Sequence, residues 1–398
     1  MKLNFNMNMN IRQRMLIIIM SITSIVLIIS TIISFFAMYD GKKQVRRVGD
    51  EIIQKSTESS SKILSEQKIS ELLHIAEDKS EDVNSSLLYL MRDVDLIANA
   101  MTNIYTHPDK FFPRILEDYN KISVQYDSSI KDQSFTTDMG MMANLQNMLY
   151  NFNETNPMVD LMVLSSKDGV TIGTRNKNSN RSRSNEDESK IYNVLSVDWY
   201  KKAVSERKII FSDVRNFVFS GKPGFFCAEP YFNGNNEIMG VAAAQISLER
   251  INKMVQEVEL YNTGFCFIMD NHGRVILSSD DDVYSEDNPS EVGISLKRDV
   301  RDLENKELAE AAEKMMAGEK GIVKVKIDGA THYLAFAPVE ITGWSFATAI
   351  EEKEVNEPIK ENNEIIEEVT NSNIEELSDR LKFTIIFTII LMIFSLRI

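Results

Sequence analysis

Residues 15–38 form a run of 24 residues without a charged side chain, and this run limits the possible folds more than any other feature. A helix needs roughly 20 apolar residues to cross a bilayer, so the run predicts a transmembrane helix. A secretory signal peptide would have a shorter apolar stretch and a small-residue cleavage site, and neither is evident. Residues 1–14 are then expected to lie in the cytoplasm.

A second apolar segment, FTIIFTIILMIFSL, lies at the C-terminal end of the sequence, within residues 383–398. Its 14 residues are few for a membrane crossing, and a buried or interfacial helix is the alternative interpretation. We favour a second transmembrane helix that is truncated, so that the output domain that would follow it is missing from this chain.

Composition excludes some classes of protein. The formal net charge is −15 and no long basic patch offsets it, so a nucleic-acid partner is not expected, because phosphate binding needs clustered Lys and Arg. The two cysteines, Cys227 and Cys266, cannot form a disulfide-rich framework. Both lie in apolar, strand-like runs, which favours two separately buried thiols over a disulfide between them. No cofactor is expected.

Residues 39–104 are predicted to form a long stalk helix. Apolar side chains recur at helical spacing, with steps of four and three residues from Val83 onward. These side chains are Ile69, Leu73, Ala76, Val83, Leu87, Leu90, Val94, Ile97 and Met101. The stripe can pack against a second copy of the chain in a homodimer, or equally against the chain's own core. Pro108 and Pro113 are expected to end the helical run.

Two similar modules are predicted to follow the helix. Residues 105–250 contain a strand pair joined by an Asp-Gly turn and then three more strands, with a helix on one side. Residues 251–350 repeat this order of strand pair, variable middle and three strands. Residues 351–382 form a charged helical linker, interrupted at Pro358. The predicted fold class is α+β, with a long N-terminal stalk helix and two tandem PAS-like modules of antiparallel sheet between transmembrane helices.

Three segments give the chain a resemblance to a known family. They are the segment Asp198-Trp199-Tyr200, the strand at residues 240–248 and the closing strand at residues 343–346. Together with the order of elements, they make the chain resemble the double Cache sensor domains of bacterial chemoreceptors and sensor kinases. The resemblance implies a cell-membrane receptor with residues 39–382 outside the cytoplasm, whereas the positive charges flanking the first helix do not decide the orientation.

The resemblance also implies that the membrane-distal module, residues 105–250, binds a small-molecule ligand. Amino-acid-binding members share a Tyr, an Arg and a Trp-Tyr pair, and Tyr192, Trp199 and Tyr200 match three of these positions. Val197 stands at the arginine position and Gln245 at a position that usually offers an aspartate. Neither side chain can pair with the charges of a free amino acid, so a neutral polar or mildly anionic ligand is expected instead of a plain α-amino acid.

The predicted ligand-binding residues are Tyr192, Trp199, Tyr200, Asp213, Arg215 and Gln245. Each has a structural alternative. The two adjacent aromatic residues can form a core pair, Asp213 and Arg215 can pair on a surface strand, and Gln245 can make a structural hydrogen bond.

Neither a metal site nor an active site is predicted. The acidic residues at 280–287 lack the glycine and spacing of a calcium loop, and the four histidines lack zinc-binding spacing. With no catalytic motif, the chain is not expected to be an enzyme. The favoured function is an extracytoplasmic small-molecule sensor, a homodimer that reaches cytoplasmic signalling proteins through the missing output domain. The alternatives are a membrane-anchored binding protein that presents ligand to a separate partner and a tethered extracytoplasmic enzyme.

Overall fold

A computed structural model of the chain describes residues 10–117, 122–125, 132–174, 193–217, 223–279, 300–302 and 305–395. It divides into two compact units, which are described separately here. One unit consists of Met1–Lys68 with Val355–Ile398, and the other is Ile69–Glu354. The second unit holds both β-sheets and all the predicted ligand-binding residues.

The first unit contains the apolar segments. Helix α1 spans Ile11–Thr106, and its Ile11–Lys55 stretch contains an 18-residue window with a mean hydropathy of 2.8. Among the described residues, it is the one helix long and apolar enough to cross a membrane. The second apolar segment ends helix α7 (Glu352–Ser395), where Phe383 and Phe387 are exposed. Its transmembrane role stays a prediction. The predicted interruption at Pro358 is wrong, because the loss of one backbone hydrogen bond does not break a helix of 44 residues.

The first module is a seven-stranded antiparallel sheet in the order β1-β3-β2-β7-β6-β4, with β5 paired to β6. Its strands are β1 (Ile122–Gln125), β2 (Val159–Ser166), β3 (Thr171–Thr174), β4 (Ile210–Phe211), β5 (Arg215–Asn216), β6 (Pro223–Phe232) and β7 (Ile238–Ser247). Its helices are α2 (Asp132–Met142), α3 (Gln146–Thr155), α4 (Asp198–Glu206) and α5 (Leu248–Gln256), with short 3₁₀ turns at Ala143–Leu145 and Val194–Ser196.

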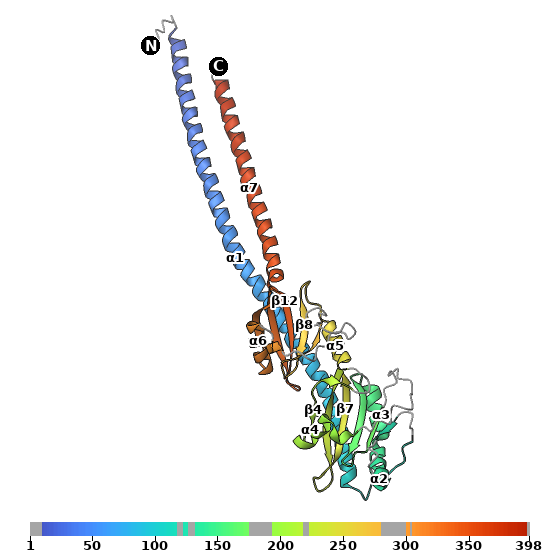
Figure 1. The fold of residues 1–398 in the computed structure, drawn as a ribbon. Coiled ribbons are helices and arrows are strands. Elements are labelled where there is room, and N and C mark those ends of the chain that lie inside the picture. Colours follow the sequence, from blue (N-terminus) through green and yellow to red (C-terminus); the bar gives the residue numbers. More distant parts are fainter. Residues whose placement is uncertain are drawn as a thin grey trace, which may run out of the picture. The chain divides into compact units, whose positions relative to one another are not determined.

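The second module is a five-stranded antiparallel sheet in the order β10-β11-β12-β8-β9 (Figure 1). Its elements are β8 (Phe265–Met269), β9 (Val275–Ser278), a 3₁₀ turn (Val300–Asp302), α6 (Lys306–Met316), β10 (Gly321–Ile327), β11 (Ala330–Val339) and β12 (Trp344–Glu351). Read from β4 to β3, the first sheet has the matching order β4-β6-β7-β2-β3. The predicted internal repeat is therefore confirmed at the level of topology.

The first module is larger than predicted. It has seven strands instead of five, because β1 was not predicted and the segment at residues 208–216 forms two strands of two residues each. Strands this short leave no alternating pattern to detect. Helices α2 and α3 were also missed, since their sequences are mostly polar or mixed. Helices cover both faces of the sheet instead of one, with α4 over one face and the end of α1 on the other.

The apolar stripe of α1 is buried inside the chain. Every predicted position from Val83 to Met101 is at most 1% exposed, and Leu72 replaces Leu73 as the buried residue one turn before Ala76. The helix is also tied to both sheets by side-chain hydrogen bonds. The Thr102 hydroxyl accepts from the Phe232 N–H at 3.1 Å, and the Asn84 side chain accepts from the Ile341 N–H at 3.0 Å. The stripe is thus a contact within the chain, and it gives no support to a homodimer.

The two cysteines are separate buried thiols, as predicted. Cys227 lies on β6 of the first sheet and Cys266 lies on β8 of the second. Burial raises the pKa of each thiol, so neither is a reactive thiolate at neutral pH.

Candidate ligand-binding site

The candidate site is the face of the first sheet that α4 covers. Side chains alternate between the two faces of a strand, which puts Val163 of β2, Phe226 of β6 and Ala243 of β7 on the same face. They pack with Trp199 and Tyr200 of α4 in one buried cluster. The helix begins at Asp198, where the helix dipole favours a carboxylate. It ends at Glu206, and the following residue, Arg207, adopts the left-handed conformation.

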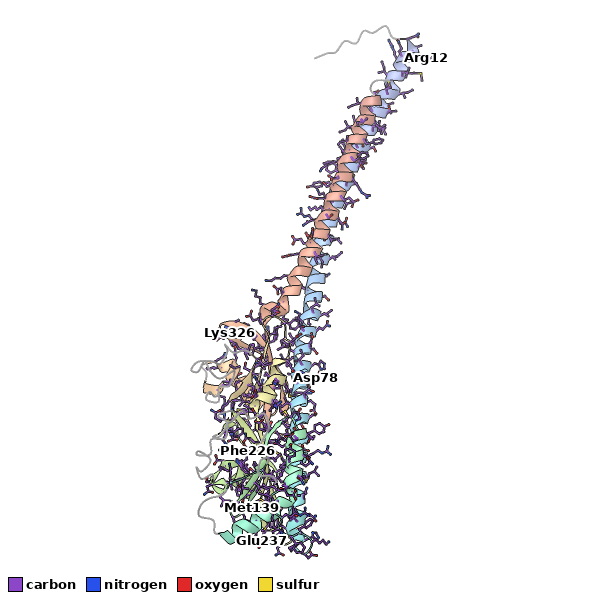
Figure 2. All side chains as sticks on the ribbon, turned by 90° about the vertical axis from the view of Figure 1, so that its right-hand side faces the viewer. Arg12, Asp78, Met139, Phe226, Glu237 and Lys326 are labelled. Atoms are coloured by element: carbon purple, nitrogen blue, oxygen red, sulfur yellow. The ribbon has the colours of Figure 1, made fainter. Side chains whose placement is uncertain are left out.

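Trp199 lies at the centre of this face. It is 2% exposed, and its indole stacks on the Phe226 ring with centroids 4.8 Å apart and planes 22° apart. Its Nε1–H is buried and has no hydrogen-bond partner among the described residues. A buried donor without a partner costs about 1–3 kcal/mol, so this N–H is available to a polar group that is not part of the described chain. Figure 2 shows Phe226 within the first sheet, on β6.

Tyr200 has a structural role that the sequence did not reveal. Its hydroxyl donates to the Ser166 carbonyl at 3.1 Å, which fixes α4 to the end of β2. Burial raises the pKa of Tyr200, so the hydroxyl stays protonated and remains a donor. The Tyr200 ring can therefore line the candidate site, but its hydroxyl is already hydrogen-bonded to the Ser166 carbonyl. Tyr192, the remaining aromatic residue of the prediction, lies outside the described residues.

Gln245 lies on the same face as Trp199. It is opposite Leu161 on β2 and opposite Phe226 on β6, and its side chain is half-buried. No described residue hydrogen-bonds its amide, so the structural hydrogen bond considered for Gln245 is not found there. The site thus combines the Trp199 donor with an amide that can donate and accept.

Arg215 lies at the edge of this face. It pairs with Gly224 of β6, and its guanidinium forms an ion pair with Asp198 at 3.2 Å, at the start of α4. Gly224 is required there, since a Cβ would come within 2.2 Å of the Ile246 carbonyl oxygen and 2.3 Å of the Phe217 ring. The alternative considered for these residues, a surface pair between Asp213 and Arg215, is not found, because Arg215 pairs with Asp198 and Asp213 contacts His272.

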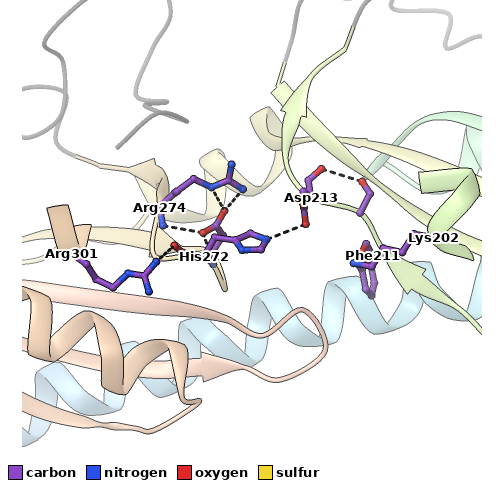
Figure 3. A network of polar contacts seen from close by, with 8 residues as sticks. Lys202, Phe211, Asp213, His272, Arg274 and Arg301 are labelled. Carbon is purple, nitrogen blue, oxygen red and sulfur yellow. Dashed lines mark hydrogen bonds and ion pairs between the residues drawn. The ribbon is translucent and has the colours of Figure 1, made fainter. Parts of the chain in front are cut away.

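Asp213 is not brought together with the other predicted residues. Its carboxylate contacts Nε2 of His272 in the second module at 3.4 Å (Figure 3). In the same polar network Arg301 donates to the His272 carbonyl at 3.1 Å, and Arg274 pairs with the buried Asp270 at 2.6 Å. Asp213 is thus a contact between the two modules.

A cleft of about 210 Å³ lies beside this polar network. Its lining includes Lys202, Glu206, Asp213, Asp270, Asn271 and Trp344. The charged groups are largely engaged: Lys202 donates to the Phe211 carbonyl, and Asp213 and Asp270 have the partners given above. This engagement makes the α4 face of the first sheet the better candidate for a ligand.

The sequence did not identify two residues of the site, Phe226 and Asp198. Phe226 is one of two adjacent phenylalanines on β6, and only the sheet register shows which of them faces Trp199. Asp198 was noted only as part of the segment that carries the family resemblance, and its ion pair with Arg215 was not predicted. Among the described residues, no group of three or more His, Cys, Asp or Glu side chains gathers as a metal site. The acidic segment 280–287 lies outside them.

Comparison with known proteins identifies the family. The Cache domain model dCache_1 matches residues 60–359, which is more than half of the chain. The chain therefore belongs to the Cache domain family. A sequence relative is the methyl-accepting chemotaxis protein McpA of Bacillus subtilis (strain 168), 25% identical over 167 residues. The aligned region is 42% of this chain and 22% of McpA, so it spans about a fifth of that relative.

Solved sensor domains share the fold at low sequence identity. The periplasmic sensory domain of the Campylobacter jejuni chemoreceptor Tlp1 matches with a TM-score of 0.55 and 12% identity, over 74% of this chain and 99% of that chain. The extracellular domain of the histidine kinase mmHK1S-Z3 gives a TM-score of 0.51 and 16% identity, over 75% and 98%. The ligand-binding domain of C. jejuni Tlp3, in complex with 4-methylisoleucine, gives 0.50 and 13%, over 74% and 95%.

Proposed function

We propose that this chain is the sensing part of a transmembrane receptor and that a small molecule binds on the α4 face of the first module. The observation that carries the proposal is the buried Nε1–H of Trp199, which lacks a partner among the described residues. Buried donors are nearly always paired in folded proteins. A ligand acceptor on this face would satisfy the donor, and Gln245 and Arg215 would supply further contacts.

The proposed arrangement follows the order of elements in the sequence. Residues 15–38 and 383–398 cross the membrane, residues 1–14 are cytoplasmic, and residues 39–382 lie outside. The first module, about residues 105–250, is membrane-distal, and the second, about residues 251–350, is membrane-proximal. The stalk helix and the 351–382 linker connect them to the membrane. A homodimer remains part of the proposal, and its support is now the exposed side chains of Leu88, Tyr89 and Leu96 on α1.

The ligand is expected to be neutral and polar or mildly anionic. The polar groups on the α4 face are the Trp199 N–H, the Gln245 amide and the Arg215 guanidinium, and the Asp198 carboxylate is already paired with Arg215. Val197, in place of the family's arginine, offers no charge to a carboxylate. Among the described residues of this face, no unpaired carboxylate is present that could bind an ammonium group. A plain α-amino acid is therefore a poor match, unlike 4-methylisoleucine for Tlp3.

Signalling requires two states that the ligand distinguishes. A ligand that competes with Asp198 for Arg215 would move α4 relative to β5. Asp213, two residues before Arg215, contacts His272 of the second module. We infer that this short segment carries the displacement toward β12 and α7, and from there to an output domain that acts on cytoplasmic signalling proteins.

Two other functions lead to different expectations. A membrane-anchored binding protein would use the same α4 face, but its α1 and α7 would not respond to the ligand. A tethered enzyme would need titratable groups facing a ligand, and Trp199, Gln245 and the paired Arg215 are unsuited to acid–base chemistry. The sensor is favoured because the chain belongs to a family of sensor domains.

A thermal-shift screen of the full chain in detergent micelles tests the proposal. The compounds should cover carboxylates, purines, sugars, amines and amino acids, because a bound ligand raises the melting temperature by mass action. We expect a carboxylate or neutral polar hit whose shift is lost in Trp199→Ala and Gln245→Ala but kept in the matched control Gln256→Ala. A hit that survives both site substitutions would contradict the proposed site.

A further inference from the structure

Four basic side chains follow the first apolar segment on α1. Lys42, Lys43, Arg46 and Arg47 begin four residues after Met38, where the uncharged run ends. Residues four apart lie on the same side of a helix, so these side chains form two adjacent rows on one side of α1. Lys43, Arg46 and Arg47 are exposed, and Lys42 is half-buried. They form a compact basic patch that the proposed ligand site does not use.

The contact of α1 with α7 shows where this patch lies relative to the apolar segments. The two helices run side by side and antiparallel in the first unit (Figure 1). The Lys42 ammonium donates to the Ser378 hydroxyl at 3.3 Å, and a Cβ added to Gly49 would lie 2.9 Å from the Thr370 methyl carbon. This register brings the end of the first apolar segment level with the start of the second, because each boundary is four or five residues from the Lys42–Ser378 contact. The two segments thus share one boundary, just below the basic patch.

The patch lies at the depth of lipid headgroups if this boundary is the edge of the hydrocarbon core. A helix rises 1.5 Å per residue, so the four Cα atoms lie about 6–14 Å beyond the apolar run. The headgroup layer on each side of a bilayer is about 5–8 Å thick. Lys and Arg have long apolar stems that let the charged end reach back toward the interface. All four charges can therefore reach lipid phosphates.

The four cations also lack carboxylate partners, unlike other basic residues of the same helices. Among the described residues, no carboxylate forms an ion pair with any of the four. At the corresponding level of α7, Arg380 and Lys382 pair with carboxylates of their own helix at 2.7 and 2.8 Å. Farther along α1, Lys55 pairs with Glu51 at 3.1 Å. The charge of the patch is thus available to an anion outside the described chain.

We propose that Lys42, Lys43, Arg46 and Arg47 bind the phosphate groups of anionic phospholipids at the membrane surface. The proposal rests on the membrane topology proposed above, but not on which side of the membrane the patch faces. Arg can bind a phosphate through two parallel hydrogen bonds, and Lys binds it as a point charge. Because the cations at this level of α7 are paired within that helix, the lipid contacts would hold α1 at a fixed height in the membrane.

The test uses the full chain in nanodiscs of phosphatidylcholine with 20 mol% phosphatidylglycerol. After mild detergent extraction, mass spectrometry counts the lipids that the chain retains. One basic residue near an anionic surface favours binding about fivefold, so the retained ratio of phosphatidylglycerol to phosphatidylcholine should exceed that of the nanodisc at least about fivefold. The combined variant Lys42→Gln, Lys43→Gln, Arg46→Gln and Arg47→Gln keeps good helix formers, and its retained ratio should match that of the nanodisc.

Two double variants that remove equal charge provide the matched control. Arg46→Gln with Arg47→Gln should lower the enrichment, whereas Lys55→Gln with Lys62→Gln, farther along α1, should leave it unchanged. Inorganic phosphate at 10 mM should not displace the retained lipid, because the acyl chains also hold the lipid beside the apolar helix.

Three results would overturn the lipid site. The first is a chain that inserts into the nanodiscs but retains the two lipids in the nanodisc ratio. The second is an enrichment that persists when all four residues are changed to glutamine. The third is displacement of the lipid by inorganic phosphate, because the ligand would then be a free phosphate. A chain that fails to enter nanodiscs of pure phosphatidylcholine would instead contradict the membrane topology, and the lipid site with it.

Discussion

The two modules share one strand order but differ in how they fill the helix-covered face of the sheet. In the second module α6 closes over a cluster of buried apolar side chains that includes Phe265, Phe267 and Phe336. In the first module α4 packs Trp199 into a buried apolar cluster with Phe226 and Ala243. The Trp199 N–H lacks a partner among the described residues, and the nearby Gln245 is only half-buried. The repeated topology therefore builds a buried apolar cluster in each module, and the one in the first module also holds an N–H without a partner among the described residues.

Equivalent strand positions show the difference directly. Gln245 on β7 is opposite Leu161, two residues beyond Ala243, which is opposite Val163. In the second sheet Ala349 is opposite Phe265, two residues beyond Ala347, which is opposite Phe267. Small residues on the last strand thus meet phenylalanines in the second module, and the space is filled. This difference in packing is what favours the first module as the proposed ligand-binding module.

The two modules also differ in how the carboxylate of one glutamate is hydrogen-bonded. Glu354, at the start of α7 beside the second sheet, accepts the N–H groups of Asn262 and Thr263 at 2.7 and 2.8 Å, together with the Thr263 hydroxyl. In the first module Oε2 of Glu229 has no such partner among the described residues. The second module satisfies its buried charge within the chain, whereas the first leaves polar groups unpaired on both faces of its sheet.

Placing a glutamine at position 349 of the second module, which is equivalent to Gln245 of the first, should have the largest effect on stability. Ala349→Gln would place an amide in a site that is 0% exposed and closely packed, which should cost about 3–5 kcal/mol from overpacking and an unpaired polar group. Gln245→Leu should change stability by less than about 1 kcal/mol. Denaturant unfolding of each variant checks this. Equal losses in the two modules would remove the distinction between them.

Trp199→Phe keeps an aromatic ring on Phe226 and removes only the indole N–H and some volume. We expect a stability loss of about 1–2 kcal/mol from the smaller ring, because no hydrogen bond to a described residue is lost with the N–H. Affinity for a hit from the ligand screen should fall at least about tenfold if the N–H binds the ligand. Calorimetric titration of the variant measures this, and unchanged affinity would show that the ligand does not use the indole N–H.

Stability should depend on pH through Glu229 of the first module. Burial, followed by the Asp95 carboxylate of α1, raises the pKa of Glu229 from 4.5 to about 7. A raised carboxyl pKa means that the native chain keeps a proton that the unfolded chain releases, so stability falls as pH rises from 4.5 through 7.

Glu229→Gln should remove this dependence and exceed the wild type above pH 7 by about 1–2 kcal/mol, a value reduced for solvent screening. Melting temperatures from pH 5 to 8.5 measure it. Glu237→Gln, at an exposed position, is the control and should retain the wild-type slope. A steep slope that persists in Glu229→Gln would assign the titration to another group.

The contact between the modules should give the smallest effect. Both side chains of the Asp213–His272 pair are more than half exposed, and such surface pairs are worth about 0–1 kcal/mol. Asp213→Asn should therefore change the melting temperature by less than about 2 °C while leaving ligand affinity intact. If it lowered affinity as strongly as Trp199→Phe, Asp213 would be a ligand contact after all, as the sequence had suggested.

The sequence predicted the parts of the fold that have a strong periodic signal. The spacing from Val83 to Met101 identified the buried stripe of α1, and the Asp-Gly turn at Asp168 identified the β2–β3 pair. It predicted one strand at residues 208–216 and could not divide it into β4 and β5, because strands of two residues are defined only by their pairing with β6. It also did not decide whether the α1 stripe packs within the chain or against a second copy, since both need the same residues.

Only part of the site was predictable. Trp199 and Gln245 came from the family motif, and strand alternation places Gln245 on the face of the sheet that α4 covers. The Arg215–Asp198 pair joins residues 17 positions apart, and it depends on the close approach of β5 to β6 at Gly224. No charge pattern in the sequence distinguishes Asp198 from Asp213 as a partner of Arg215, so this pair could not be predicted. The unpaired state of the Trp199 N–H can be seen only in three dimensions.

Hydrogen exchange of the full chain, measured with and without a hit from the ligand screen, tests the central claim most directly. The account predicts ligand-dependent protection of α4, β6 and β7 in the first module, with β8, β9 and α6 of the second module unchanged. Protection confined to β8, β12 and α6 would contradict it, because the ligand would then occupy the second module.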